Sequence, residues 1–280
     1  QISIALCAMA LEGMGLPVIS LCAWQVGLHT SSTYSDARIK RIDSERIQRE
    51  LDKNKIVLVA GFQGINRVGD VTTLGRGGSD TSAVALAAAF RADLCQIYTD
   101  VDGVYTTDPR AVASARKLSE ITYDEMLELA SQGAQVLHNR SVELAKKYHV
   151  NMEVVSSLER KPGTKVKEVV KMEKTNIAGV AKDTSIARIA VVGLAHNPGV
   201  AFRIFSLLGR ANINVDAIIQ SIGRDESKDI SFTLPRADVE EAVKVLEGQK
   251  EVLHFDHVTV EDKIAKVSIV GAGMMTTPGV

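Results

Sequence analysis

The stretch TTLGRGGSDTS, residues 72–82, carries residue types suited to binding a small charged molecule. Arg76 lies among glycines, and its planar guanidinium matches the geometry of a carboxylate. The stretch follows a strand-like run and opens a helix-like one, so free backbone N–H groups at the helix start would favour an anion. Asp80 could hold an amine or orient a lysine. Together these residues indicate an amino acid ligand better than a bare phosphate.

Two common phosphate-binding loops are excluded at this position. No Gly-Lys-Ser/Thr follows the glycines, as a P-loop requires, and the spacing is not that of the dinucleotide-binding fingerprint. The structural alternative is a tight turn in which Ser79 or Asp80 caps the next helix. The pattern alone does not separate a binding loop from such a turn.

A second polar group lies in YTDVDGVYTTDPR, residues 98–110, directly after a strand-like run. Asp100, Asp102 and Asp108 supply carboxylates that could bind Mg²⁺ or polar cofactor groups. Tyr105 could stack on a base, and Arg110 could pair with a phosphate. Taken by itself, the segment favours the alternative of an Asp-Gly turn with solvated acids.

A third group lies in the C-terminal half, where the turn HNPGVA, residues 196–201, precedes a helix-like run. Residues 214–216, Asn-Val-Asp, open the next strand-like run. We expect both groups to lie at the same end of the C-terminal domain. There the N–H groups of the helix would bind the carboxylate of an effector, and Asp216 would bind its ammonium. The alternative is ordinary turn and N-cap chemistry.

The hydrophobic pattern predicts the elements that must position these groups. Strand-like runs alternate with helix-like ones, which implies a mostly parallel α/β sheet. The expected strands are residues 17–21, 55–61, 94–99 and 152–155, and the expected helices are residues 2–11, 39–54, 80–91, 122–131 and 141–148. The run at 55–61 is wholly apolar, as in a strand buried on both faces. Thr122 and Glu125 form a capping box.

A charged segment with a Pro-Gly pair, residues 158–174, predicts a linker to a different architecture. The order that follows is βαββαβ, the ferredoxin-like plan. Its strands are predicted at residues 187–193, 213–220, 228–234 and 252–261, and its helices at 199–211 and 237–248. IARIAVVG at 186–193 recurs as IAKVSIVG at 264–271, and HNPGV at 196–200 is echoed by TTPGV at 276–280. We therefore expect a second, truncated copy of the module.

The composition excludes several classes of partner. The 280 residues carry a net charge of -1, so no basic field invites nucleic acid. The longest apolar stretches fall well short of the ~20 residues of a membrane-spanning helix. The three cysteines are widely spaced in apolar contexts, which indicates free thiols in a reducing cytoplasm.

Taken together, TTLGRGGSDTSA, IYTDVDGVYTTDPR, ITYDEMLELASQGAQVLH and the Pro-Gly repeat closely resemble the aspartokinase family, in its monofunctional lysine- or threonine-sensitive type. The resemblance covers essentially the whole chain. It implies an amino-acid-kinase domain at 1–165 that lacks its N-terminal part. A linker and a first ACT domain would follow at 166–262, and the start of a truncated second ACT domain at 263–280. The implied reaction is ATP-dependent phosphorylation of L-aspartate to 4-phospho-L-aspartate with Mg²⁺, the first step of lysine, threonine and methionine biosynthesis.

The resemblance also assigns roles to individual residues. Arg76 corresponds to the clamp on the aspartate carboxylate, with Gly77 and Ser79 beside it, and Asp80 to the acid that organises the catalytic lysine. It implies no metal ligand from the protein. The implied ATP contacts are Thr99, Asp100, Tyr105, Arg110 and Gln135. The implied contacts of an allosteric effector are His196, Asn197, Gly199, Val200, Ala201, Asn214, Val215, Asp216 and Gln220.

Two departures from the family pattern bear on catalysis. The family's Lys-Phe-Gly-Gly segment would precede Gln1, so we expect the chain as it stands to be inactive. Where the family often has Gly-Ala-Lys-Val-Leu-His-Pro-Arg, this sequence has Gln135 in place of the lysine and Asn139 in place of the proline; other members also lack the lysine, so its loss is not expected to inactivate. Losing one charged hydrogen bond at Gln135 would weaken ATP binding by ~1.5–3 kcal/mol.

Two alternatives and an assembly follow from the same motifs. The chain could be a non-catalytic amino-acid-binding regulator with a vestigial kinase domain. It could also be another kinase of the same fold, acting on glutamate or a nucleotide, although the ACT repeat argues against that. Lysine, threonine or both are expected to bind between paired ACT modules, which implies a homodimer or a hetero-oligomer.

Overall fold

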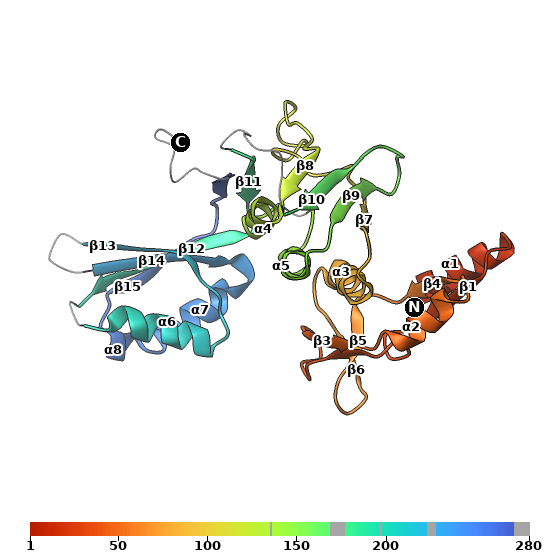
Figure 1. Cartoon of the computed structure of the whole chain (residues 1–280). Coiled ribbons are helices and arrows are strands. Elements are labelled where there is room, and N and C mark those ends of the chain that lie inside the picture. The colour runs from red at the N-terminus through yellow and green to blue at the C-terminus, as the bar shows by residue number, and fades with distance from the viewer. Residues whose placement is uncertain (135, 169–176, 196–197, 223–227, 272–280) are drawn as a thin grey trace. The chain divides into compact units, whose positions relative to one another are not determined.

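The computed structural model describes residues 1–134, 136–168, 177–195, 198–222 and 228–271 of the chain. It divides into two compact units, which we describe separately (Figure 1). The first unit comprises residues 1–181 and 269–280, and the second comprises residues 182–268. The domain boundaries expected at residues 165 and 262 stay a prediction.

The first unit is an α/β structure whose strands pair in several small sheets. β1 (Val18–Leu21) and β4 (Ile56–Val59) form a parallel pair. The second sheet has the order β7-β9-β10-β8, with bounds Cys95–Thr99, Met152–Ser156, Thr164–Lys167 and Glu120–Thr122. The third has the order β3-β2-β5-β6, with bounds Ile39–Ile42, Leu28–Thr30, Gln63–Ile65 and Val71–Thr73. β11 (Gly179–Asp183) and β16 (Lys266–Val270) form a further two-stranded sheet, and the boundaries of the two units, after residue 181 and after residue 268, fall within these two strands.

The predicted α/β class is confirmed, with both parallel and antiparallel pairs. β7–β9, β8–β10 and β2–β5 are parallel, whereas β9–β10, β2–β3 and β5–β6 are antiparallel. The helices of this unit are α1 (Ile2–Gly13), α2 (Glu45–Leu51), α3 (Gly78–Phe90), α4 (Tyr123–Ser131) and α5 (Asn139–Tyr148). The predicted capping box is confirmed, because Thr122 Oγ1 accepts the Glu125 N–H at 3.2 Å and the Glu125 carboxylate accepts the Thr122 N–H at 3.0 Å.

Three sequence predictions for this unit are wrong in part. The helix expected at 39–54 begins only at Glu45, because Ile39–Ile42 pairs with β2 as a strand. The run at 55–61 is not buried on both faces, since Ile56 is 39% exposed; an all-apolar run marks hydrophobicity but does not supply covering layers. The expected linker contains β10, in which Thr164 and Val166 face inward while the intervening Lys165 is exposed.

The larger of two hydrophobic clusters in the described residues of the first unit lies where α3, α4 and α5 pack with β7, β9 and β10. Met126, Val142 and Val154 are fully buried in this cluster. Tyr123 also belongs to it and donates its hydroxyl to the Val150 carbonyl at 2.7 Å. This core holds the helices that carry the candidate site residues described below.

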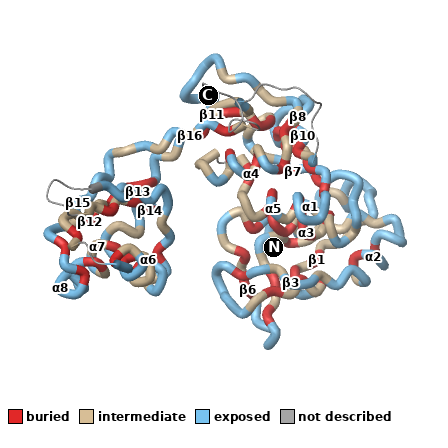
Figure 2. The backbone as a smooth tube through the Cα atoms, turned by 60° about the vertical axis from the view of Figure 1, so that its left-hand side comes forward, coloured by how far each residue is buried: buried red, intermediate tan, exposed pale blue. Residues whose placement is uncertain are grey.

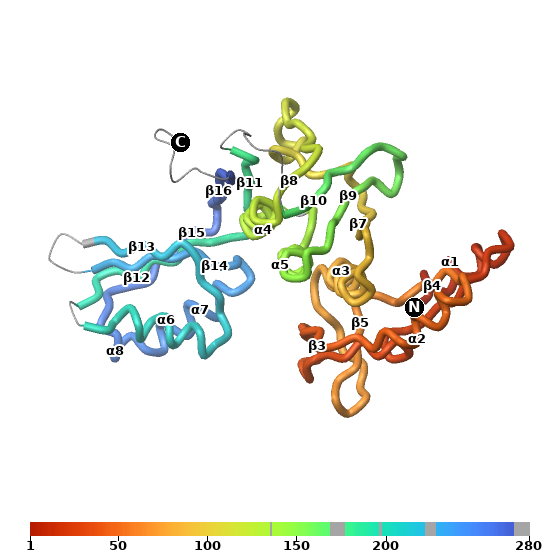
Figure 3. The backbone as a smooth tube through the Cα atoms, viewed as in Figure 1, coloured from red at the N-terminus to blue at the C-terminus, as the bar shows by residue number. Residues whose placement is uncertain are grey.

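The second unit confirms the predicted ferredoxin-like plan. In the described residues its four-stranded sheet has the order β13-β14-β12-β15, and all neighbours are antiparallel. The helices α6 and α7 lie on one face of this sheet, and buried positions recur on both layers (Figures 2 and 3). The strands are β12 (Ile186–Leu194), β13 (Asp216–Ile222), β14 (Lys228–Pro235) and β15 (His257–Glu261), and the helices are α6 (Val200–Arg210), α7 (Val239–Glu247) and α8 (Lys250–Leu253), with a 3-10 turn at Arg236–Asp238.

Two points of the second unit's prediction change. The strand expected at 252–261 starts late, because α8 covers Lys250–Leu253 and His254 ends that helix in a left-handed conformation. The repeat of the first strand is found as β16, but the echoed turn at 276–280 lies outside the described residues.

Candidate active site and effector region

The glycine loop lies between β6 and α3, and its glycines are required by geometry. Gly75 and Gly77 have φ values of +76° and +67°, a left-handed conformation that glycine adopts without strain. A Cβ on Gly77 would lie 2.3 Å from the His138 Cβ, and one on Gly75 would lie 3.1 Å from Asp36 Oδ1. The loop is therefore wedged between two other segments of the chain.

The helix after this loop starts earlier than the sequence predicted. α3 begins at Gly78 with Gly77 as its N-cap, so the alternative in which Ser79 or Asp80 caps the helix is wrong. The left-handed glycine turn brings the chain directly into the helix. Ser79 and Asp80 therefore lie inside the first turn of α3, where their side chains are not needed as caps.

Arg76 is the charged side chain of the loop that is free to bind a ligand. Its side chain is exposed, and no hydrogen bond or ion pair of its guanidinium is found among the described residues. Ser79 Oγ donates to Asp80 Oδ1 at 3.3 Å. Burial raises the pKa of the Asp80 carboxyl, while the Ser79 hydroxyl and the His138 backbone partly offset that effect. The loop thus presents an unpaired cation beside a half-buried acid.

The predicted nucleotide segment begins at the end of β7, and its side chains contact one another. Thr99 Oγ1 donates to Asp100 Oδ1 at 3.0 Å. Arg110 forms a two-pronged pair with Asp108, with Nε–Oδ1 at 3.0 Å and Nη2–Oδ2 at 3.1 Å, and its side chain is 87% exposed. Binding of phosphate by Arg110 would therefore compete with this exposed pair.

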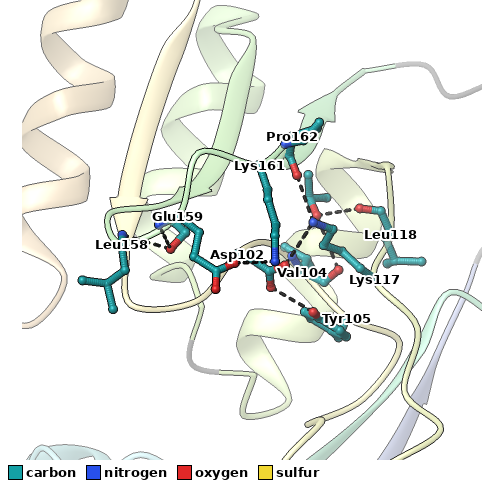
Figure 4. Close-up of polar contacts among 11 residues, drawn as sticks. Asp102, Val104, Tyr105, Lys117, Leu118, Leu158, Glu159, Lys161 and Pro162 are labelled. Carbon is teal, nitrogen blue, oxygen red and sulfur yellow. Dashed lines mark hydrogen bonds and ion pairs between the residues drawn. The ribbon is translucent and has the colours of Figure 1, made fainter.

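Asp102 organises the turn that carries Tyr105 (Figure 4). Its carboxylate accepts the Tyr105 hydroxyl at 2.9 Å and the Lys117 ammonium at 3.1 Å. Lys117 also donates to the Pro162 carbonyl at 2.9 Å. Burial acts to raise the pKa of Asp102, but the hydrogen bonds from Tyr105 and Lys117 lower it overall. Asp102 therefore does not fit the alternative of a turn with solvated acids, because its carboxylate is hydrogen-bonded to Tyr105 and Lys117.

Thr164 anchors the same turn from β10. Its Oγ1 accepts the Val104 N–H at 2.8 Å and donates to the Leu118 carbonyl at 2.6 Å. Gly103 has a φ of +149°, and a Cβ there would lie 2.6 Å from Thr164 Oγ1. Gly103 is needed because the turn passes directly against this buried threonine.

The glycine loop and the nucleotide segment are not joined by any hydrogen bond or ion pair in the part of the chain that the structure describes. Cavities of about 180 Å³ and about 170 Å³ lie beside these groups. The first is lined by residues that include Thr106 and Val180, and the second by residues that include Arg38 and Arg140. Gln135 lies outside the described residues, so its ATP contact stays a prediction.

The effector residues of the second unit differ from expectation in their placement. Gly199, with a φ of +85°, is the N-cap of α6, and Val200 and Ala201 begin that helix. Asn214 and Val215 lead into β13, which starts at Asp216 and contains Gln220. His196 and Asn197 lie outside the described residues.

The expectation that both effector groups lie at one end of the module is wrong. In the sheet, Asp216 is level with Thr233 and hence with Arg188 at the start of β12. The turn before Gly199 follows the other end of β12. The reason is that α6 runs back along the sheet before β13 begins, so the two groups are separated by a strand length of about 20 Å.

Asp216 already has a cationic partner, which the sequence did not reveal. The Lys266 ammonium at the start of β16 lies 2.7 Å from its Oδ2, and the Ala217 N–H donates to its Oδ1 at 2.8 Å. Lys266 lowers the pKa of the Asp216 carboxyl. A lysine within the chain thus takes the position that was predicted for the ammonium of an effector.

Several contacting residues escaped sequence reasoning. His138 reads as an ordinary capping residue, and it does accept the Arg140 N–H at 3.4 Å, but it also covers Gly77. The only local signal was its place at the end of the motif ITYDEMLELASQGAQVLH. Lys117, Thr164 and Lys266 carried no distinguishing pattern.

In the described ranges, no group of three or more His, Cys, Asp or Glu side chains is arranged to hold a metal ion. Among the same residues, no helix has the length and apolar character needed to cross a bilayer.

The comparisons with known proteins place both units in recognised classes. Residues 1–156 match the model of the amino acid kinase family, and residues 189–249 match the model of an ACT domain. The chain is therefore an amino acid kinase that carries an ACT domain.

Within that class, the chain belongs to the aspartokinase family. It is 52% identical over 281 residues to an aspartokinase of Bacillus sp. strain MGA3, covering 100% of this chain and 68% of the relative. It resembles the structure of E. coli aspartokinase III in complex with aspartate and ADP, with a TM-score of 0.82 and 27% identity over 98% of this chain and 62% of that one. For the complex of the same E. coli enzyme with lysine and aspartate, the TM-score is 0.72 at 29% identity, covering 93% and 59%. The chain thus spans about two thirds of the length of these relatives.

Proposed function

We propose that the protein transfers the γ-phosphoryl group of ATP to the side-chain carboxylate of L-aspartate, forming 4-phospho-L-aspartate. The observation that carries this proposal is the exposed, unpaired guanidinium of Arg76 in a glycine loop that two other segments of the chain hold in place. Membership of the aspartokinase family supports it, as does the aspartate and ADP bound by the E. coli relative. This reaction would be the first step towards lysine, threonine and methionine. ATP use and three free thiols suit a reducing cytoplasm.

The proposed roles follow from charge. Both reactants are anions, so positioning and positive charge do most of the catalytic work. Arg76 would hold the aspartate carboxylate together with Gly77 and Ser79, and Asp80 would orient a lysine towards the phosphoryl group. The nucleotide would lie against the segment that contains Thr99, Asp100, Tyr105 and Arg110, and against Gln135.

Mg²⁺ would enter this site with the nucleotide. Magnesium in kinase sites is held largely by substrate phosphates and water, with one or two protein carboxylates. Asp100 is exposed at the end of β7 and suits such a partial role, whereas Asp102 is committed to Tyr105 and Lys117. When bound, the ion would neutralise charge on the transferring phosphoryl group.

The direct test is to trap the acyl phosphate with hydroxylamine. The natural gene product that contains this chain is incubated with aspartate, ATP and Mg²⁺, and aspartyl hydroxamate is measured. Hydroxamate that requires all three reactants is the expected result. Its absence, with a protein shown to be folded by circular dichroism, overturns the proposal. Glutamate in place of aspartate serves as the substrate control.

Regulation by L-lysine, L-threonine or both is the second part of the proposal. The E. coli relative binds lysine. In this chain Asp216 and the turn at Gly199 lie at opposite ends of the module, so one small ligand touches both kinds of group only between two modules. We therefore propose that the effector binds at a pairing of ACT modules, in a homodimer or a hetero-oligomer.

One observation favours a second candidate function. Gln135 stands where the family often has a lysine, which removes a cation from the proposed nucleotide site. A non-catalytic amino-acid-binding regulator would need no such cation. Calorimetry distinguishes the two functions, because a regulator binds lysine or threonine but gives no heat with MgATP.

A further inference from the structure

Arg140, in the first turn of α5, is a largely buried arginine beside the glycine loop, and its guanidinium makes several hydrogen bonds. Its side chain is only 11% exposed. Nη1 donates to the Leu74 carbonyl at 2.5 Å and to Asp36 Oδ1 at 2.9 Å, and Nη2 donates to the Ala37 carbonyl at 2.9 Å. Both terminal nitrogens are therefore directed at protein oxygens. One guanidinium joins three segments that are far apart in sequence.

Two of these acceptors depend on Arg140. Leu74 and Ala37 are both 0% exposed, so water does not reach them. No other hydrogen bond to either carbonyl is found in the described part of the chain. Buried carbonyls of this kind are costly to leave without a donor. The guanidinium is thus the group that allows the two backbone segments to lie side by side.

The Arg140 contacts act on the residues that set the direction of Arg76. Leu74 immediately precedes the loop, and its N–H donates to the Phe62 carbonyl at 2.9 Å. Asp36 forms a wall of the loop, because a Cβ on Gly75 would lie 3.1 Å from its Oδ1. With one guanidinium holding both the start of the loop and this wall, the path from Leu74 to Arg76 is fixed.

We infer that Arg140 is a positioning residue for the aspartate site, acting through the glycine loop and not on the substrate. The inference rests on the proposed function, since it takes Arg76 as the group that binds the aspartate carboxylate. The fork of Arg140 holds the Leu74 carbonyl and Asp36 in one geometry, and Arg76 then projects towards the substrate. A lysine at position 140 has one nitrogen and cannot reproduce the fork.

The location of Arg140 separates its effect from that of the nucleotide segment. None of its contacts involves the residues from Thr99 to Arg110. A loss of Arg140 should therefore change the requirement for aspartate and leave the requirement for ATP. A purely structural role would lower thermal stability without that selective change.

The experiment compares R140K and R140M with the wild type in the natural gene product that contains this chain. Steady-state kinetics give kcat and separate KM values for aspartate and MgATP, and circular dichroism reports folding. We expect the aspartate KM to rise about tenfold in R140M and less in R140K, with an ATP KM within about twofold of wild type. K147M, at an exposed lysine of the same helix, is the matched control, and both of its KM values should stay within about twofold of wild type.

Each other outcome overturns the inference. A folded R140M enzyme with an unchanged aspartate KM shows that Arg140 does not position the loop, as does a rise confined to the ATP KM. If neither variant folds, Arg140 serves the folding of the first unit and not the site. A wild-type protein without aspartate-dependent turnover is a different failure, because it contradicts the proposed function itself.

Discussion

A side chain at Gly77 would collide with His138, and this contact, together with the left-handed φ of Gly77, explains why that position of the candidate loop is glycine. The glycines let the backbone turn left-handed and pass against His138, the N-cap residue of α5. They leave Arg76 as the exposed group of the loop. At the scale of the residue, the ligand that the site can bind depends on which side chains are unpaired and which already have a partner within the chain.

Replacing Arg76 tests its role directly. R76A should raise the aspartate KM about tenfold to a hundredfold, because a lost charged hydrogen bond costs ~1.5–3 kcal/mol. Steady-state kinetics on the natural gene product provide the measurement. R67A, at an exposed arginine in the turn before β6, is the matched control and should behave as wild type. If R76A weakens only ATP binding, the assigned role of Arg76 is incorrect.

The thiols should differ sharply in reactivity. Burial raises the pKa of Cys95 to about 11, with a smaller contribution from the Asp80 charge, whereas Cys7 is exposed. At pH 8 only about a thousandth of Cys95 would be thiolate, the reactive form. Alkylation with iodoacetamide, followed by mass spectrometry, should label Cys7 first and Cys95 only after unfolding. Rapid labelling of Cys95 in the native C7S variant would contradict its burial.

At the scale of the element, the nucleotide segment is held by residues that do not belong to it. Lys117 holds Asp102 (Figure 4). Thr164 of β10 holds Val104, and the two contacts together fix the turn at Gly103. The segment therefore owes its shape to β10 and its neighbours. Its own sequence specifies only that a turn is present.

Removing Lys117 should loosen this segment. We expect K117M to raise the ATP KM about tenfold, because the contact with Asp102 is partly buried and worth ~1.5 kcal/mol. The aspartate KM should stay near the wild-type value. K165M, at an exposed lysine of β10, is the control. An unchanged ATP KM in K117M would show that the Asp102 contact does not hold the nucleotide site.

The same variant has an expected pH signature. Folding lowers the pKa of the Asp102 carboxyl. Its contacts therefore stabilise the folded state fully at pH values above the ordinary carboxyl pKa, and this stabilisation is lost as the pH falls through the folded-state pKa. Without Lys117 the pKa rises, and the loss occurs at higher pH. Acid unfolding followed by circular dichroism should therefore begin at higher pH in K117M than in K165M.

The ion pair between β13 and β16 predicts competition in effector binding. Because the Lys266 ammonium is paired with the Asp216 carboxylate, the ammonium of an effector has to displace Lys266 from that carboxylate. K266M should therefore bind lysine or threonine about twofold to fivefold more tightly, as an exposed pair contributes up to ~1 kcal/mol. Isothermal calorimetry gives the affinities, with K263M as the neighbouring control. Weaker binding in K266M would show that Lys266 itself contacts the effector.

At the scale of the whole molecule, the chain forms two units with separate cores. Phe232 is fully buried in the second unit and meets Phe205 edge to face, with ring centroids 5.6 Å apart. Leu129 is 2% exposed in the core of the first unit. Separate cores allow each unit to lose stability without the other.

Core substitutions should reveal this independence. F232A should destabilise the second unit by ~3–5 kcal/mol and L129A the first by ~2–5 kcal/mol. Differential scanning calorimetry of the chain should show two transitions, of which each variant shifts one. A single transition that moves in both variants would contradict independent unfolding.

Local patterns in the sequence predicted most elements, because a period, a cap or a turn is encoded by residues that are neighbours in the chain. The capping box of Thr122 and Glu125 predicted the start of α4, and the βαββαβ order predicted the fold of the second unit. Patterns failed where hydrophobicity or charge mimicked another state, as in the strands at Ile39–Ile42 and Thr164–Lys167. For the site, the family resemblance supplied Arg76, Asp80 and the nucleotide residues, whose binding roles stay predictions.

By itself, the sequence determined the kinds of element, the two-part organisation and the motifs that mark the aspartokinase family. Only the tertiary structure decided what touches the glycine loop, because Arg140 lies 66 residues from Leu74 and 104 from Asp36 along the chain. It likewise decided that Asp216 faces Lys266, 50 residues away, and lies at the far end of the module from Gly199. Such contacts depend on the path of the whole chain, and no local pattern of residues encodes that path.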